Sequence, residues 1–390
     1  MNLEEVKKLY SDYVLNTYTR TDLCLIKGKD TIVEDINGKK YLDFFPGWAV
    51  SGLGHCNRHV IKNVKDQIKK IVHVSNNYYN ELQGELSSII IHNSFNGKVF
   101  YSNSGAEANE GAIKLARKFG NPERFEVITM QKSFHGRTIA TLTATGQDKV
   151  KKGFDPLPAG FKHVLFNDIK ALEDAIGPKT VAVMLELVQG EGGINIADKE
   201  YVKDIRRICD EKNLVLIIDE VQTGAGRTGK MFAFQHYGIK PDVMTLAKSF
   251  GGGFPIGVMV VRDKFCDILT PGTHASTFGG SPVICAAALG VFDAIQKDGL
   301  LEKAEKMSLI LKKSLDAIKA RKPVIGKIKI LGLMIGVELN VEDASGIYMK
   351  CLEKGLLINC TQKNILRIMP PLCVKKSEIK KAMQILEESL

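Results

Sequence analysis

The middle of the chain alternates short apolar runs with segments of helical periodicity, and this alternation restricts the possible folds more than any other feature. The run Leu214–Ile218 contains only leucine, valine and isoleucine, which is typical of a strand buried on both faces of a parallel sheet. Similar strands are predicted from about residue 97 onwards, at Lys98–Ser102, Phe125–Met130, Val181–Leu187, Val243–Leu246 and Val258–Val261. Strands that alternate with helices indicate an α/β domain with a mostly parallel sheet. Ligands of such a domain gather at the carboxyl ends of the strands.

The first 50 residues follow a different pattern. A helix is predicted at residues 3–15, and two strand-like pieces follow at Thr31–Glu34 and Lys40–Phe44. They are joined through Asn37-Gly38, a pair that favours a hairpin turn.

The last third of the chain predicts a second, smaller α+β unit. A helical stretch covers Ala286 to Ala320, a pair of strands follows at Lys327–Ile330 and Met334–Leu339, and a last helix begins at Lys376. A chain of 390 residues is also long enough for two domains. The expected division is an N-terminal segment of residues 1–50 that packs with the small domain, a large α/β domain of residues 51–285, and a small domain of residues 286–390.

Charge and composition argue against several classes of protein. The net charge is +10, but many lysines, such as Lys303, Lys306 and Lys312, are spaced like the solvated face of a helix, and no arginine-rich tract accompanies them. We therefore expect no nucleic acid partner. No run approaches the length of about 18 apolar residues that spans a membrane, and the first residues lack the pattern of a signal peptide.

The eight cysteines are scattered and contain no C-x-x-C pair. This distribution argues against a disulfide framework and against a zinc site, so we expect no metal. It favours a reducing compartment, and the cytoplasm is the expected location.

A run of small residues follows the predicted strand Lys98–Ser102. Ser104, Gly105 and Ala106 open a helix there. The free N–H groups and the dipole of a helix N-terminus bind anions such as phosphate. A helix cap formed by Ser104 alone would leave the same pattern.

Asp219 and Lys248 each come just after an apolar strand. At this position the carboxylate of Asp219 points into the ligand crevice and needs a cation or a donor. Lys248 precedes the glycines Gly251–Gly253, and a lysine desolvated there works as an amine nucleophile toward carbonyls. A turn-capping aspartate and a surface lysine are the alternative interpretations. Together with the helix start, however, these residues meet the needs of pyridoxal phosphate.

The glycines of residues 224–229 match the pattern G-x-G-x-x-G literally. A dinucleotide fingerprint requires the first glycine at the end of a strand and a helix that begins within the motif. Here Asp219 to Thr223 intervene. We interpret these glycines as a flexible loop of the active site, and a nucleotide-binding oxidoreductase remains as the hypothesis from a different class.

Seven segments match one family in the same order. They are Phe100–Ala108, Ser133–Thr138, Glu186–Gly193, Ile218–Gly224, Lys248 with its glycines, Ser276–Gly280 and Leu366–Pro371. In these segments, and over nearly its whole length, the chain resembles the class III aminotransferases of fold type I. These enzymes act on ornithine, acetylornithine or 4-aminobutyrate. The resemblance implies a large domain with a mostly parallel sheet and a smaller α+β domain.

The resemblance also implies pyridoxal 5'-phosphate as the cofactor and a homodimer as the assembly. Gly105 and Ala106 would hold the cofactor phosphate, and Thr277 would hold it from the partner subunit. Asp219 would form a salt bridge with the pyridinium nitrogen, and Lys248 would form the Schiff base and carry protons.

Two further residues are assigned to the cofactor by the resemblance. Phe134 would stack on its pyridine ring, which suits an aromatic side chain, and Gln222 would contact the ring hydroxyl.

The same resemblance assigns residues to the substrates. Arg137 would grip a carboxylate, for which a guanidinium is suited. Glu191 and Arg367 match the pair that opens to admit the dicarboxylic substrate, and Ser276 would touch substrate.

The implied reaction moves an amino group from an amino acid to 2-oxoglutarate. Resemblance in chain length, in the region Gly47–His55 and in the segment Leu366–Pro371 favours N-acetylornithine as the donor, with ornithine and 4-aminobutyrate as close competitors. A regulator that binds the cofactor without catalysis would need a DNA-binding extension, and the sequence has none.

The chain departs from the usual family pattern at several positions. Leu187 stands where proline is common, Lys329-Ile330 replaces Arg-Gly, Ser281 replaces an asparagine, and Asn57-Arg58 replaces His-Pro. None of these changes removes a chemical group from the reaction.

Overall fold

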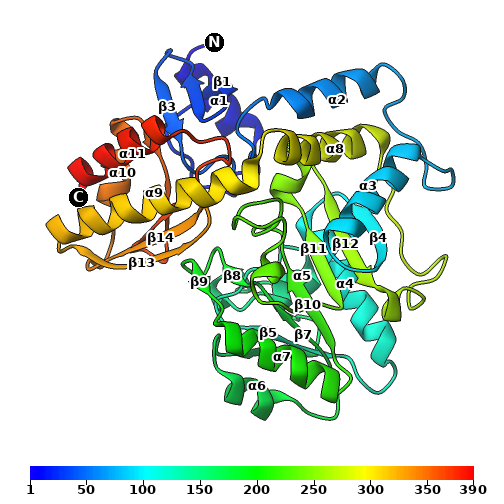
Figure 1. The fold of residues 1–390 in the computed structure, drawn as a ribbon. Helices are drawn as coiled ribbons and strands as arrows, with labels where there is room; N and C mark the ends of the chain where they lie inside the picture. The colour runs from blue at the N-terminus through cyan, green and yellow to red at the C-terminus, as the bar shows by residue number, and fades with distance from the viewer.

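The computed structural model describes all 390 residues. Its centre is a seven-stranded sheet in the order β4-β12-β11-β10-β7-β5-β6. The strands are β4 (Gly97–Ser102), β5 (Glu126–Met130), β6 (Phe161–Val164), β7 (Thr180–Leu185), β10 (Val215–Asp219), β11 (Val243–Leu246) and β12 (Gly257–Arg262). Only β12 runs against its neighbours, since it pairs antiparallel with both β11 and β4. The expected α/β fold with a mostly parallel sheet is confirmed (Figure 1).

The apolar run of β10 explains how the sheet is buried. Val215 and Ile217 pack in a cluster with Ala112 and other residues of α4 (Gly105–Gly120). The alternating residues Leu216 and Ile218 belong to the main core, together with the inner face of α7 (Lys199–Glu211). Because side chains of a strand alternate between the two faces, helices cover the sheet on both sides.

Shorter elements surround this sheet. They are α5 (Ile139–Ala144), α6 (Ile169–Ala175), β8 (Val188–Gln189), β9 (Asn195–Ile196), and four short 3-10 helices at Asp148–Val150, Ala233–His236, Lys248–Gly251 and Asp263–Phe265. Strand β6 was not predicted, because its sequence, Phe-Lys-His-Val, is only half apolar.

Three helices pack together beside the β4 edge of the sheet. They are α2 (Arg58–Ile68), α3 (Glu81–Asn93) and α8 (Pro282–Lys297). The helical stretch predicted from Ala286 to Ala320 is in fact two helices, α8 and α9 (Leu300–Arg321). They are separated at Gly299, which has a φ of 58°, and only glycine adopts this left-handed conformation without strain.

A four-stranded sheet in the order β13-β14-β17-β16 lies in the C-terminal part of the chain. Its strands are β13 (Ile325–Leu331), β14 (Met334–Leu339), β16 (Asn359–Thr361) and β17 (Ile365–Ile368), and α9, α10 (Ser345–Glu353) and α11 (Lys376–Ser389) belong to the same part of the chain. All neighbouring strands of this sheet run antiparallel.

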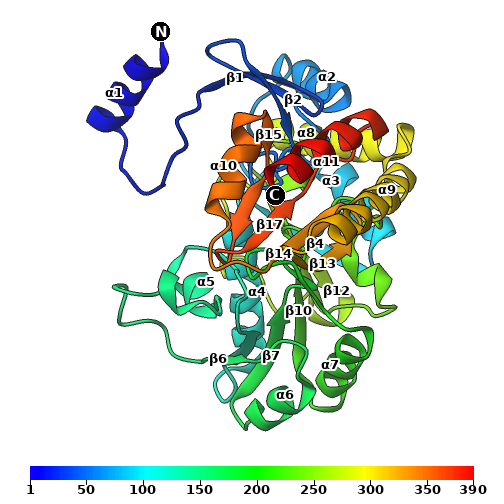
Figure 2. The same cartoon turned by 90° about the vertical axis from the view of Figure 1, so that its left-hand side faces the viewer.

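The N-terminal strands are completed by a strand from near the C-terminus. β2 (Ile32–Asp35) and β3 (Lys40–Asp43) form the predicted hairpin. β1 (Leu25–Lys29), which was not predicted, pairs antiparallel with β2, and β15 (Leu356–Leu357) pairs parallel with β3. Helix α1 (Leu3–Tyr13) has no buried residue and stands away from the body on an extended connection (Figure 2). None of the helices combines the length and apolar composition that a bilayer crossing requires.

Candidate active site

A cavity of about 500 Å³ opens at the carboxyl ends of the central strands. It is lined by segments far apart in the sequence, which the sheet brings to one edge. The predicted site residues among its lining are Gly105, Ala106, Phe134, Arg137, Glu191, Asp219, Gln222 and Lys248.

The helix start at Ser104 has the form of an anion site. The Ser104 hydroxyl accepts a hydrogen bond from the Glu107 N–H at 3.2 Å, so the cap that the sequence predicted is present. The N–H groups of Gly105 and Ala106 have no partner within the helix, because they lie in its first turn. Both residues line the cavity, and these N–H groups therefore remain for a ligand.

Asp219 ends strand β10 with its carboxylate held on several sides. Its Oδ2 accepts hydrogen bonds from Asn109 Nδ2 and from His135 Nδ1, both at 2.8 Å, and its Oδ1 accepts one from the Val221 N–H at 3.0 Å. The side chain is only 4% exposed. These donors fix the orientation of the carboxylate.

Lys248 opens the short helix after β11 with a left-handed φ of 49°. Its side chain lines the cavity, and its amine forms no hydrogen bond within the chain. Burial lowers the pKa of this amine, and the nearby carboxylate of Glu191 opposes that shift. A desolvated amine with a lowered pKa is available as a nucleophile.

Gln222 lies close to the backbone of Gly190. Its side-chain oxygen is buried and has no hydrogen-bond partner. A β-carbon at position 190 would lie 1.8 Å from that oxygen. A larger residue at position 190 would therefore push the Gln222 side chain from its place, and the unpaired oxygen is free to accept a hydrogen bond from a ligand.

Phe134 and Glu186 form one wall of the cavity. The Phe134 N–H donates to Glu186 at 2.9 Å, and the Gly190 N–H donates to the same carboxyl group at 3.3 Å. Burial raises the pKa of Glu186 to about 7. Arg137 is exposed at the mouth of the cavity, with its guanidinium 5.6 Å from the centre of the Phe134 ring.

Glu191 and Arg367 form an ion pair at the opposite side. Arg367 Nη1 lies 2.6 Å from Glu191 Oε1. The Glu191 side chain is 20% exposed and lines the cavity, whereas Arg367 is fully buried behind it. The rings of Phe45 and Trp48 lie 4.5 and 5.5 Å from the guanidinium.

Besides Arg367, two more of the predicted residues lie outside the cavity, Ser276 and Thr277. The Ser276 hydroxyl is 3.4 Å from Asn103 Nδ2, and Asn103 does line the cavity. Thr277 is exposed at the surface. Neither residue completes the site within a single chain.

The sequence prediction gave no role to several residues that the structure brings to the site. His135, Asn109 and Glu186 surround Asp219, and Asn359 contacts Arg367. His135 and Glu186 stand inside the matching segments quoted above, which was the one available indication. Asn109 and Asn359 carried none.

The glycine-rich loop of residues 224–229 differs from the prediction. It is buried and does not line the cavity. Arg227, which lies within it, donates hydrogen bonds from Nη1 to the carbonyls of Leu333 and Pro370. The loop therefore holds the two parts of the chain together, and its glycines do not form a dinucleotide site.

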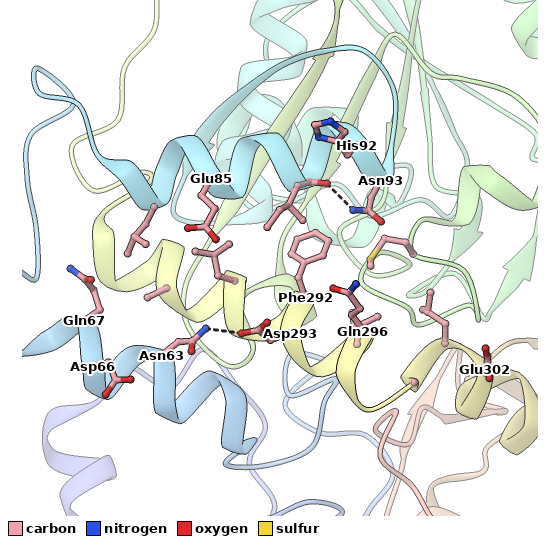
Figure 3. Close-up of a pocket in the computed structure, with 18 of the residues that line it drawn as sticks. Asn63, Asp66, Gln67, Glu85, His92, Asn93, Phe292, Asp293, Gln296 and Glu302 are labelled. Atoms are coloured by element: carbon pink, nitrogen blue, oxygen red, sulfur yellow. Dashed lines mark hydrogen bonds between the residues drawn. The ribbon is translucent and has the colours of Figure 1, made fainter.

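A larger cavity of about 720 Å³ lies between α2, α3 and α8. Figure 3 shows acidic side chains around it, among them Asp66, Glu85 and Glu302. None of the predicted site residues lines it. The smaller cavity, which contains the buried lysine and the fixed carboxylate, is the candidate active site.

A family model described as aminotransferase class-III matches residues 13–390. The chain belongs to this family. It is 52% identical over 382 residues to the acetylornithine aminotransferase of Caldanaerobacter subterraneus subsp. tengcongensis, with 97% of each chain covered. The identity is 47% over 396 residues to the acetylornithine aminotransferase of Methanocaldococcus jannaschii, with 100% of this chain and 98% of the relative covered.

A solved structure is also closely similar. It is an ornithine aminotransferase from Toxoplasma gondii, crystallised with oxidised glutathione, with partial occupancy of PLP at its active site. The TM-score is 0.94 at 32% identity, covering 99% of this chain and 94% of that one. The predicted family and fold are thereby confirmed.

Proposed function

We propose that this class III aminotransferase moves the terminal amino group of N-acetylornithine to 2-oxoglutarate, which gives N-acetylglutamate semialdehyde and glutamate. The chain is 52% and 47% identical to two acetylornithine aminotransferases over nearly the full length of each chain, and this similarity favours acetylornithine as the amine donor. The reaction belongs to arginine biosynthesis.

The residues of the cavity fit pyridoxal phosphate, which the enzyme uses as its cofactor. The free N–H groups of Gly105 and Ala106 suit the phosphate, and the fixed carboxylate of Asp219 suits a protonated ring nitrogen. The unpaired oxygen of Gln222 suits the ring hydroxyl, and the unpaired amine of Lys248 suits the aldehyde. When bound, the cofactor supplies an electron sink for the bond that breaks at the substrate carbon.

The chain's own residues then hold and move protons. Asp219, whose carboxylate is oriented by three donors, would hold a proton at the ring nitrogen of the bound cofactor. The amine of Lys248 would carry a proton to and from the substrate carbon. Phe134 would pack beside the ring and exclude water there.

The substrates are held by two cations at different depths. Arg137, exposed at the mouth, binds the carboxylate at the far end of acetylornithine. Arg367 binds the carboxylate on the reacting carbon of glutamate after Glu191 has moved away. Ser276 contacts the substrate through the loop that also carries Thr277.

We infer a homodimer, in which the partner's Thr277 completes the phosphate site. Exposed apolar side chains surround Thr277 on the surface, notably Phe278, Tyr78 and Tyr79. The side chain of Asn76 donates to the carbonyls of Ser276 and Gly279, so these two segments form one surface. Light scattering on the purified protein should give twice the mass of the chain, and an active monomer would contradict this assembly.

We also infer that the enzyme acts in the cytoplasm. All eight cysteines are free thiols, and free thiols are usual in a reducing compartment.

The choice of amine donor is tested by steady-state rates with 2-oxoglutarate as the acceptor. Acetylornithine, ornithine and 4-aminobutyrate are compared at equal concentrations. We expect the highest kcat/KM for acetylornithine. A clear preference for ornithine or 4-aminobutyrate would overturn the substrate while leaving the family unchanged.

A further inference from the structure

The guanidinium of Arg367 is completely bonded, and its partners fall into two groups. It makes five hydrogen bonds, as many as a guanidinium has N–H donors. Nε and Nη2 donate to Asn359 Oδ1 at 3.1 and 2.8 Å, and Nη1 donates to the Gly190 carbonyl at 2.8 Å. The remaining two donors, one on Nη1 and one on Nη2, reach the two oxygens of Glu191 at 2.6 and 3.3 Å.

The two groups differ in how firmly they are fixed. Asn359 lies on β16 directly opposite Arg367 on β17, and the two residues are paired in the sheet. Gly190 contributes a backbone carbonyl, beside which a larger residue would collide with Gln222. Glu191 instead reaches Arg367 with a partly exposed side chain that lines the cavity. Of the two side-chain partners, Glu191 is the one that lines the cavity and can turn into it, whereas Asn359 lies outside the cavity and is paired with Arg367 in the sheet.

The departure of Glu191 would free one N–H on each terminal nitrogen of Arg367. Two parallel N–H groups on neighbouring nitrogens match the two oxygens of a carboxylate. The three bonds to Asn359 and Gly190 would remain, so the guanidinium would keep its plane and position. The rings of Phe45 and Trp48 would also continue to pack beside it.

We propose that Asn359 is a positioning residue. Its side-chain oxygen holds the Arg367 guanidinium in the orientation in which two parallel N–H groups bind the substrate carboxylate in place of Glu191. This inference rests on the proposed function, since it concerns the dicarboxylic substrate of the same site. The oxygen of Asn359 occupies the two donors that face away from Glu191. Any carboxylate must therefore bind at the edge that Glu191 vacates, and the two cannot bind together.

The inference is tested with the holoenzyme and with glutarate, a dicarboxylate that lacks an amine and cannot react. Trp48 is the only tryptophan of the chain, and its ring lies 5.5 Å from the Arg367 guanidinium. Its fluorescence should report binding of glutarate directly. A second readout follows the two half-reactions separately, one with glutamate and one with acetylornithine.

The variants are Asn359→Leu, which keeps the volume but removes the acceptor, and Asn364→Ala as the matched control. Asn364 lies between β16 and β17, but its side chain donates to the Leu339 carbonyl and not to Arg367. If Asn359→Leu does not fold, Asn359→Ala replaces it. Thermal unfolding confirms that each variant is folded.

We expect Asn359→Leu to weaken glutarate binding and the apparent affinity for glutamate by about ten- to hundredfold, as for a lost hydrogen bond to a charged group. The half-reaction with acetylornithine should stay near that of the wild type, and Asn364→Ala should change neither. Unchanged glutarate binding in folded Asn359→Leu would overturn the inference, as would an equal loss in both half-reactions. If acetylornithine proves not to be the donor but glutarate binding still depends on Asn359, the proposed amine donor is wrong and the proposed role of Asn359 is supported.

Discussion

Asp219 and Glu191, two carboxylates of the cavity, each contact a side-chain nitrogen at a similar distance, yet the two contacts are built differently. Asp219 lies 2.8 Å from His135, and both side chains are almost completely buried. Glu191 lies 2.6 Å from Arg367, but its side chain is 20% exposed. Asp219 also receives a donor from Asn109 and one from the backbone. Its contact is therefore enclosed on several sides, whereas that of Glu191 is open to the cavity, as the proposed exchange with substrate requires.

The difference follows from the elements that supply the residues. Asp219 ends β10, and its donors come from α4, from the segment after β5 and from its own turn, all of which pack on the central sheet. Glu191 follows β8, whereas Arg367 lies on β17 of the four-stranded sheet. The Asp219 carboxylate is therefore enclosed by segments that pack on one sheet. The Glu191–Arg367 ion pair instead joins the segment after β8 to the four-stranded sheet, and the proposed function requires it to open for the substrate.

The largest effect is expected for Asp219→Ala, which removes the fixed carboxylate. Turnover should fall about a thousandfold, or roughly 4 kcal/mol in transition-state stabilisation, because the ring nitrogen loses the group that keeps it protonated. The measurement is kcat per folded enzyme. Near-normal turnover would mean that another residue serves the ring nitrogen.

Asp242→Ala is the matched control for this variant. Asp242 is a buried aspartate that pairs with Arg206 at 2.9 Å, away from the cavity. Its loss should lower the free energy of unfolding while leaving kcat of the folded enzyme intact.

A smaller and more selective effect is expected at the Glu191–Arg367 contact. Arg367→Ala should slow the half-reaction with glutamate about a hundredfold, as expected for a lost charge-assisted pair. It should affect the half-reaction with acetylornithine much less. Arg137→Ala should damage both half-reactions, because both substrates carry a carboxylate at the end far from the reacting amine. Equal damage to both half-reactions from Arg367→Ala would refute this division between the two cations.

The smallest effect is expected in the pH dependence of stability. Burial raises the pKa of Glu186 from its ordinary value of 4.5 to about 7. The folded protein therefore binds this proton more tightly than the unfolded chain, and its stability falls as the pH rises between these two values. In Glu186→Gln, the decrease in the free energy of unfolding over this pH range should be smaller than in the wild type by on the order of 2 kcal/mol.

Denaturant unfolding at pH 5 and pH 7.5 measures this difference. If the wild type and Glu186→Gln lose the same stability between the two pH values, Glu186 is not the group that takes up the proton.

Local sequence patterns predicted the site residues that directly follow the strands of the central sheet, but not the residues that contact them. Asp219 and Lys248 were found because each follows an apolar strand, and the chain direction alone brings such residues to one edge of the sheet. The start of α4 was found for the same reason. The glycine at 299 could have predicted the break between α8 and α9, but both flanking segments are strongly helical and concealed it.

The contacts around these residues could not be predicted, because they join distant positions. His135 and Asn109 lie 84 and 110 residues from Asp219, and no local pattern indicates that they meet. The pairing of Asn359 with Arg367 depends on the register of two short strands, and a shift of one residue would have turned Asn359 away. The antiparallel direction of β12 could not be predicted either, because its apolar sequence indicates a buried strand but not the direction in which the strand runs.

The central claim is that Lys248 is the residue that bonds to the cofactor, and borohydride reduction tests it most directly. Reduction of the holoenzyme makes this bond permanent, and peptide mass mapping then locates the phosphopyridoxyl group. We expect a single label on Lys248, whose side chain lines the cavity with Asp219. A label on any other lysine would contradict it.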